Sequence, residues 1–286
     1  MRHANADQPG SRGYLYYRHT LPVRIMHWTN LVALTILLMS GLQIFNAHPR
    51  LYWAGKSSYT GVPPVLEIGA TQSDAAGIVG FTRVLGHEFV TTGVLGVSND
   101  RTGQPSVRGF PWWATIPDNR WLSMARSWHF FFAWVLLVNG LVYVAHSTAS
   151  RHLARDLAPD GNDWRSIGRS IRDHLRLRHP TGEAAKRYNV LQKLAYLVII
   201  FVILPLIILM GVAMSPWMNS VLPGWVDLFG GRQAARTLHF VAAWLLVAFG
   251  LIHVFEVIVS GLWNHLRSMI TGRYRIRTEE RHEQDA

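Results

Sequence analysis

Four long runs of apolar residues divide the chain, and the central part of each holds no Asp, Glu, Lys or Arg. A helix that crosses a lipid bilayer needs about 20 consecutive, mostly apolar residues, and each run meets that length. The pattern predicts membrane spans at about residues 22–46, 121–147, 191–214 and 233–260. Pro205 lies inside the third span, where it is expected to kink the helix.

The segments between these runs are predicted to be loops. A fifth apolar stretch, residues 78–97, contains charged residues and four glycines, so we assign it to the first loop, where it can lie against the membrane surface. The predicted fold class is an all-α membrane protein. It is an up-and-down four-helix transmembrane bundle in one domain, residues 1–286, with an outer loop at 47–120 and an inner loop at 148–190.

Arginine and lysine favour the cytoplasmic side of short loops, and here they gather on one side of the spans. The segment before the first span and the tail after the fourth are rich in arginine, and nine basic residues lie between Arg151 and Arg187. The loop between the third and fourth spans has only Arg232 before the span edge, and the first loop is nearly neutral. Both termini are therefore predicted to be cytoplasmic and the first loop extracytoplasmic.

The two long loops each carry a further signal. The first is rich in Gly, Pro, Trp and Tyr, and its length favours a folded cap or a partner-docking surface; a disordered loop is the alternative. The inner loop predicts a short basic amphipathic helix, either on the membrane surface or as a solvated helix. Its apolar positions at helical spacing are Trp164, Ile167, Ile171 and Leu175.

The chain has no cysteine, which excludes disulfides, thiolate zinc sites, iron–sulfur clusters and covalent c-type haem. Only 16% of the residues are charged, against about 25% in an ordinary soluble domain. The net charge of +11 follows the membrane topology, so we expect lipid and not nucleic acid as a partner. The first 20 residues are polar; no cleavable signal peptide is expected, and the first span serves as the insertion signal.

Five histidines lie within the spans or at their edges, and an ionisable side chain at membrane depth marks a candidate functional site. They are His27, His129, His146, His239 and His253. His239 and His253 are fourteen residues apart on one helix, which turns them to nearly the same face and separates them by about 21 Å. Two haems stacked across a hydrocarbon core about 30 Å thick need one ligand each at such a separation.

Depth in the membrane sorts four of these histidines into pairs. His27 and His253 lie near the inner ends of their spans, and His129 and His239 near the outer ends. We therefore predict two bis-histidine haem b sites, which leave the iron no open position and favour electron transfer. His146 lies about 100° around its helix from His129 and is assigned a capping or snorkelling role, with a proton path as the alternative. For any single histidine, a structural hydrogen bond is the alternative.

Three of the four predicted ligands follow an arginine by three residues. These arginines are Arg24, Arg126 and Arg236. Each shares a helix face with its histidine and lies one turn nearer water, where a guanidinium can pair with a haem propionate; snorkelling of an interfacial arginine is the alternative. Gly41 and Gly250 are candidates to make room for a flat porphyrin, although glycine is common in membrane helices.

Three features of the spans occur together: the motif Arg24-Ile25-Met26-His27-Trp28, the spacing of His239 and His253, and a third span without histidine. In these features the chain resembles the four-helix di-haem cytochrome b subunits of membrane-bound nickel–iron hydrogenases and formate dehydrogenases. The resemblance covers the four spans. It implies haems shared by spans one, two and four, in a bacterial cytoplasmic membrane, and electron transfer between an attached catalytic or iron–sulfur subunit and quinone.

The segment that enters the third span, residues 188–193, resembles the quinone-site stretch of the formate dehydrogenase subunits. By that resemblance Asn189, Gln192 and Lys193 lie beside the inner haem and His253; helix capping with a cytoplasmic lysine is the alternative. The long first loop departs from these members. In that loop the chain is similar to thiosulfate-reductase-like cytochromes, which makes a molybdenum-containing extracytoplasmic subunit a candidate partner.

The combined prediction is a membrane electron-transfer subunit that passes electrons between a partner oxidoreductase and the quinone pool, in either direction. Within an oxidoreductase complex, this subunit would carry out the reduction of quinone or the oxidation of quinol. A haem-free transporter and a cofactor-free membrane anchor are the alternative classes. A transporter usually shows broken helices and internal repeats, and we find no convincing repeat.

Overall fold

The computed structural model describes residues 13–53, 62–75, 77–117, 120–176 and 188–277. The chain forms two compact units, each built from segments that are distant in sequence. Unit 1 contains the residues up to His27, Tyr143–Val198 and the residues from Phe249 onward; unit 2 contains Trp28–Val142 and Ile199–Ala248.

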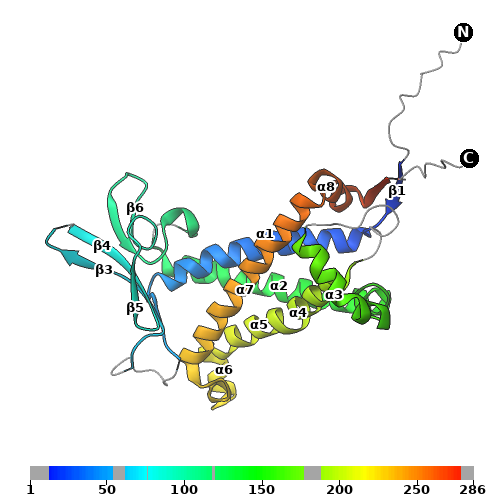
Figure 1. Cartoon of the computed structure of the whole chain (residues 1–286). Coiled ribbons are helices and arrows are strands. Elements are labelled where there is room, and N and C mark those ends of the chain that lie inside the picture. The colour runs from blue at the N-terminus through cyan, green and yellow to red at the C-terminus, as the bar shows by residue number, and fades with distance from the viewer. Residues whose placement is uncertain (1–12, 54–61, 76, 118–119, 177–187, 278–286) are drawn as a thin grey trace, which may run out of the picture. The chain divides into compact units, whose positions relative to one another are not determined.

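In the part of the chain that the structure describes, four helices are long and apolar enough to cross a membrane (Figure 1), as the sequence predicts. Three of them are α1 (Leu21–Phe45), α2 (Leu122–Ala149) and α7 (Gly231–Val259). The third span consists of α4 (Val190–Val198), the π-helical turn η4 (Ile199–Ile203) and α5 (Leu204–Ala213). Many of their large apolar side chains are exposed, which suits contact with lipid tails of similar polarity. The predicted four-span membrane fold is confirmed.

The interruption of the third span has a cause in the sequence. Pro205 lies in the first turn of α5; it has no N–H group and crowds the carbonyl of the residue four positions earlier. The turn η4 directly precedes α5, and a π-helical turn moves the hydrogen bond one residue further along the chain. The distortion predicted at Pro205 thus takes the form of a π-helical turn, which is a recognised cause of helix bending.

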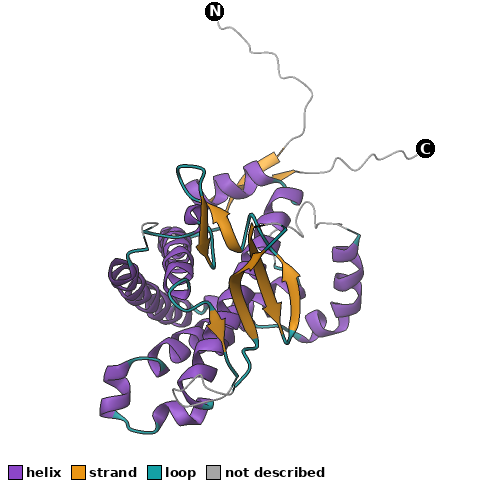
Figure 2. Cartoon of the chain, turned by 90° about the vertical axis from the view of Figure 1, so that its left-hand side faces the viewer, coloured by secondary structure: helices purple, strands orange, loops and turns teal. Residues whose placement is uncertain are grey.

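The first loop folds into a β-structured cap in unit 2; Figure 2 draws its strands in orange, as it does those of the β1–β8 pair in unit 1. A four-stranded antiparallel sheet of order β2-β3-β4-β5 is accompanied by the hairpin β6–β7. The elements are β2 (Arg50–Leu51), β3 (Leu66–Ser73), β4 (Gly77–Val84), β5 (His87–Val90), β6 (Gly96–Asn99), β7 (Pro105–Arg108) and the 3-10 turn η1 (Trp112–Ala114). The described part of the loop is folded, as the cap interpretation predicts. Most of the fifth apolar stretch, residues 78–97, lies in strands β4, β5 and β6, which the sequence pattern did not predict.

An apolar core joins the cap to two of the spanning helices. Its buried members are Leu42 and Phe45 of α1 and Leu51, Ile68 and Phe110 of the cap. Phe240 of α7 packs against the same cluster and stacks on Phe45 with the ring centres 4.8 Å apart. Burial of each large apolar side chain contributes about 1.5–3 kcal/mol. The cap is therefore held against α1 and α7 within unit 2.

A polar pair links two spans elsewhere in unit 2. The side-chain amide of Asn139 in α2 donates to the amide oxygen of Asn30 in α1 at 2.7 Å. Hydrocarbon offers no partner to a side-chain amide, so the two asparagines satisfy each other across the helix interface. The sequence analysis did not single out this pair.

Besides parts of the spanning helices, unit 1 contains helices and strands that lie outside the spans. Helix α3 (Gly161–Leu175) begins with a capping box in which Asp160 accepts two backbone N–H groups and Asp163 accepts the N–H of Asp160. This confirms the helix predicted for the inner loop. After α8 (Leu262–Thr271), strand β8 (Arg273–Arg277) pairs antiparallel with β1 (Gly13–Tyr17). Three short helices complete the described elements: η2 (Leu153–Leu157) in unit 1, and α6 (Pro216–Val221) and η5 (Trp225–Phe229) in unit 2.

Substitution of Glu67 in β3, whose carboxylate is buried, tests how much its ion pairs stabilise the cap. It accepts hydrogen bonds from Arg50 and Arg83, each at 2.7 Å, and only 7% of the residue is exposed. We expect Glu67→Gln to lower the free energy of unfolding of the cap by about 1–3 kcal/mol, because two charge-assisted hydrogen bonds at a buried position are weakened. Thermal unfolding followed by limited proteolysis of the cap measures this change.

Glu88 provides the matched control. It pairs with the same Arg83, at 2.5 Å, but its side chain is 46% exposed, so Glu88→Gln should leave the unfolding temperature almost unchanged. Equal effects of the two substitutions would show that the burial of Glu67 is unimportant.

Candidate functional site

Helices α2 and α7 bring His129 and His239 together in unit 2. Their ring centres lie 6.1 Å apart, and the ring planes are inclined at 60°. Both side chains are largely enclosed, since His239 packs against the third span and His129 against α1. Their predicted depths in the membrane pair these two histidines, and the structure places them as neighbours.

The Nδ1 nitrogens of both histidines are hydrogen-bonded, which fixes the tautomer of each ring. Nδ1–H of His239 donates to the backbone carbonyl of Ile207 at 2.8 Å. The hydroxyl of Ser40 donates to the carbonyl of Ile36 at 2.7 Å, so its oxygen accepts from Nδ1–H of His129 at 3.1 Å. Each Nε2 therefore carries the lone pair that a metal requires. The oxygen that accepts from Nδ1–H on the other side of the ring fixes the ring's orientation.

Two glycines allow the histidine rings to approach neighbouring backbones. A Cβ at Gly41 would lie 3.2 Å from Cε1 of His129, and a Cβ at Gly211 would lie 3.5 Å from Cε1 of His239. The sequence marked Gly41 as room for a porphyrin, but the group that the structure places beside Gly41 is the ring of His129. Gly211 was missed, because the third span has no histidine to draw attention to it. Beside Gly250, an added Cβ would meet no described atom within 4 Å.

His27 and His253 form the second pair, in unit 1. Their ring centres lie 6.3 Å apart, with the planes inclined at 56°. Phe249, one turn earlier on α7, stacks on His253 at 6.0 Å and 18°, and Tyr196 of α4 contacts Phe249 edge-on. The start of the third span therefore reaches His253 through two aromatic rings.

Both pairs fit a metal held between two imidazoles. A metal–nitrogen bond of about 2 Å on each side, plus about 1 Å from each nitrogen to its ring centre, places two axial rings about 6 Å apart. Among the described residues, no group of three or more His, Cys, Asp or Glu side chains is placed to hold a metal ion. Two protein donors per site suit haem, because the porphyrin supplies its own ring of nitrogen donors.

The three arginines that precede the histidines have partners of their own. Arg24 donates to the backbone carbonyl of Ile270, and Arg236 donates to the carbonyl of His48 at 2.5 Å. The guanidinium of Arg126 lies 5.8 Å from the centre of a phenylalanine ring one turn further along α2. Each arginine belongs to the same unit as its histidine. The pairing of these groups with haem carboxylates stays a prediction. His146 lies in the last turn of α2.

Asn189 and Gln192 form the start of α4. The N–H of Gln192 donates to Oδ1 of Asn189 at 2.9 Å, and the N–H of Asn189 donates to Oε1 of Gln192 at 3.3 Å, which is a reciprocal capping arrangement. Lys193 is only 8% exposed, and its ammonium donates to Asp163 of α3 at 2.7 Å. The geometry of the first two residues therefore matches the helix-capping alternative.

Tyr188 precedes this cap and is partly buried. The guanidinium of Arg18 lies 5.4 Å from its ring centre, and the ring of Tyr196 lies 5.7 Å away. Burial raises the pKa of the Tyr188 hydroxyl above its ordinary value, and the charge of Arg18 opposes this only in part. The hydroxyl is thus kept protonated at neutral pH and is available as a donor.

A family model described as prokaryotic cytochrome b561 matches residues 103–272, more than half of the chain. The chain belongs to the prokaryotic cytochrome b561 family. Membership implies haem b and a role in membrane electron transfer within an oxidoreductase system. The resemblance to cytochrome b subunits seen in the sequence is confirmed, and the haem-free alternatives lose support.

Curated relatives of this cytochrome b561 extend over most of its length. It is 27% identical to a putative protein-methionine-sulfoxide reductase subunit, YedZ1, of Azospira oryzae over 240 residues, which cover 84% of this chain and 89% of the relative. It is 22% identical to a probable Ni/Fe-hydrogenase B-type cytochrome subunit of Cupriavidus necator over 270 residues, which cover 90% of this chain and 85% of the relative.

The approach of Gly41 to His129 gives a direct test of the unit 2 pair. We expect Gly41→Leu to displace the histidine and to remove a large part of the b-type absorbance of the cytochrome, because the added side chain must occupy the position of the ring. Gly140→Leu in α2 is the control, since a Cβ there meets no described atom within 4 Å. The reduced-minus-oxidised spectrum, normalised to protein, measures both. Unchanged absorbance in Gly41→Leu would contradict the placement of His129.

Proposed function

We propose that this cytochrome b561, as one membrane domain of residues 1–286, holds two haems b and passes electrons between a redox partner and quinone. The observation that carries the proposal is the pair of histidine spacings, 6.3 Å for His27 and His253 and 6.1 Å for His129 and His239. His27 with His253 and His129 with His239 would hold the haems, and haem b held by two histidines would supply one-electron transfer and not oxygen chemistry.

The residues around the histidines would hold the sites rigid. Ser40 and the carbonyl of Ile207 fix the rings of the unit 2 pair, and such hydrogen bonds also raise the basicity of the ligating nitrogen. The apolar helices exclude water, so little solvent reorganises when the charge changes. We propose Arg24, Arg126 and Arg236 as the partners of the haem carboxylates, because each shares a face with its histidine.

We place the quinone site at the start of α4, beside the His27–His253 pair. Contacts through Tyr196 and Phe249 support this placement, since they connect α4 to His253. Lys193, with Asn189 and Gln192 at the same helix start, supplies a buried cation that can donate to a quinone carbonyl. Nearby, the protonated hydroxyl of Tyr188 is a second donor. Protons would come from the cytoplasm, where the basic inner loop lies in the predicted topology.

We propose that the cap faces the extracytoplasmic side and that a catalytic or electron-carrying redox subunit docks there. The neutral charge of the first loop and the arginine-rich termini support this orientation. One relative is named as a subunit of a protein-methionine-sulfoxide reductase and the other as a hydrogenase cytochrome subunit. Both names describe subunits of redox enzymes, which supports a catalytic partner, with a molybdenum-containing enzyme as one candidate class.

Replacing the histidines one at a time tests the assignment of the two haems. We expect His129→Ala and His239→Ala each to remove the same half of the haem b absorbance, and His27→Ala and His253→Ala each to remove the other half. His146→Ala is the control and should retain both. Haem content and redox titration measure the result; loss of half of each redox component in every variant would overturn the pairing.

Lys193 tests the quinone site. We expect Lys193→Met to slow electron exchange between haem and a quinone analogue by more than about tenfold, the cost of one lost charge-assisted hydrogen bond, with the haem content unchanged. Lys193→Arg should retain most of the rate. Asp163→Asn separates the two explanations, because it removes the ion pair and keeps the cation. If Asp163→Asn slows the reaction as much as Lys193→Met, Lys193 acts only on structure.

A further inference from the structure

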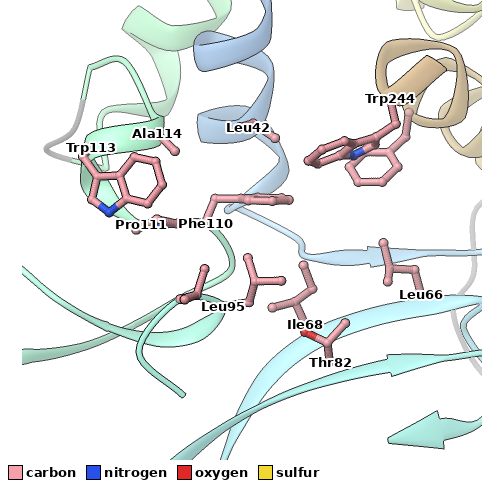
Figure 3. Close-up of a pocket in the computed structure, with 12 residues that line it drawn as sticks. Leu42, Leu66, Ile68, Thr82, Leu95, Phe110, Pro111, Trp113, Ala114 and Trp244 are labelled. Carbon is pink, nitrogen blue, oxygen red and sulfur yellow. The ribbon is translucent and has the colours of Figure 1, made fainter. Parts of the chain in front are cut away.

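A cavity of about 480 Å³ lies in unit 2 where the cap meets the spanning helices (Figure 3). Leu42 of α1 and Phe240 and Trp244 of α7 form the helical side of its wall. Side chains of the cap form the rest, among them Ile68, Leu95 and Phe110. Phe240 and Trp244 belong to the apolar run of the fourth span, so the cavity adjoins the part of the chain that faces lipid.

The lining of the cavity is apolar throughout. Among the described residues around it, no polar atom faces the open space. Thr82 is the one hydroxyl-bearing residue in the wall, and its hydroxyl hydrogen is already engaged in a hydrogen bond to Thr91. Thr91 donates to the carbonyl of Leu95 at 3.1 Å, so the hydroxyl of Thr82, 3.0 Å from that of Thr91, must donate to it. The wall therefore has no charged side chain, and its hydrogen-bonding groups, the indole N–H groups of Trp113 and Trp244 among them, do not face the open space.

Two indole rings stand in the wall. Trp113 of the cap is 63% exposed and Trp244 of α7 is 42% exposed. Tryptophan is enriched where membrane proteins pass from hydrocarbon to water. A wall that combines span residues, cap residues and exposed indoles is placed at such a boundary, and this position makes the cavity accessible to membrane lipid.

We propose that this cavity binds a hydrocarbon chain, supplied by a phospholipid of the leaflet on the cap's side. A quinone ring would bring two carbonyl oxygens into a space that no donor faces, and water would find no partners there. An acyl chain has no polar atoms to satisfy, and a cavity of this size accommodates a molecule of that class. The bound chain would fill space between the cap and α7 and so tie the cap to the bilayer. This site is independent of the quinone site proposed at α4.

Photo-crosslinking in nanodiscs tests the proposal. The full-length cytochrome is reconstituted with a phosphatidylglycerol that carries a diazirine in its acyl chain, irradiated, and mapped by peptide mass spectrometry. We expect the wild type to be labelled on the cap segment Phe110–Ala114. Ala114→Phe, which fills the cavity, should reduce that label at least fivefold. Ala75→Phe, in the exposed turn between β3 and β4, is the matched control and should keep it.

The haem b spectrum reports the integrity of each variant. If Ala114→Phe loses it, Ala114→Leu supplies a smaller filling side chain. Equal labelling of the wild type and the filled variant, or no label on this segment in the wild type, overturns the proposal. Excess long-chain quinone is added as a competitor, with a quinone that lacks the isoprenoid tail as its control. Displacement of the label by the long-chain quinone alone would identify a quinone tail as the occupant and would also overturn the proposal.

Discussion

An imidazole ring placed among apolar helices must satisfy both of its nitrogens, and much of the structure around the unit 2 pair follows from this constraint. Water cannot reach the ring, so a neighbouring backbone or hydroxyl oxygen has to accept from one nitrogen. Ser40 and the carbonyl of Ile207 do so. The rings must come close to α1 and α5 to reach these oxygens, and Gly41 and Gly211 permit that approach. Only the remaining nitrogen of each ring is left to face a metal.

The sequence predicts those parts of the molecule that depend on the period and composition of single helices. Four spans, the distortion at Pro205 and the helix of the inner loop are visible in this way, and matching of depth paired His129 with His239. The contribution of the third span was not predictable, because a backbone carbonyl such as that of Ile207 leaves no trace in the residue pattern. The β-sheet of the cap, as distinct from the cap itself, was missed for a related reason. Four of the six strands described in the cap have no more than four residues, and the sheet is stabilised by the core shared with Phe45 and Phe240.

Neighbouring residues at the start of α4 cap this helix and also bind it to α3. Asn189 and Gln192 satisfy the helix terminus, while Lys193 neutralises Asp163, which in turn caps α3. Two helices are thereby fixed to each other around a buried cation. Such rigidity favours binding of the quinone ring proposed for this site, because donors that are already ordered lose little entropy on binding.

The β1–β8 ribbon also constrains the order in which unit 1 is assembled. Strand β1 is synthesised first, yet its partner β8 follows only after all four spans. Arg24, next to His27, depends in the same way on a carbonyl 246 residues further along the chain. Translation and membrane insertion must therefore advance through the fourth span before the N-terminal segment finds its native neighbours. Unit 2 contains no residue beyond Ala248, so its fold does not depend on the pairing of β1 with β8.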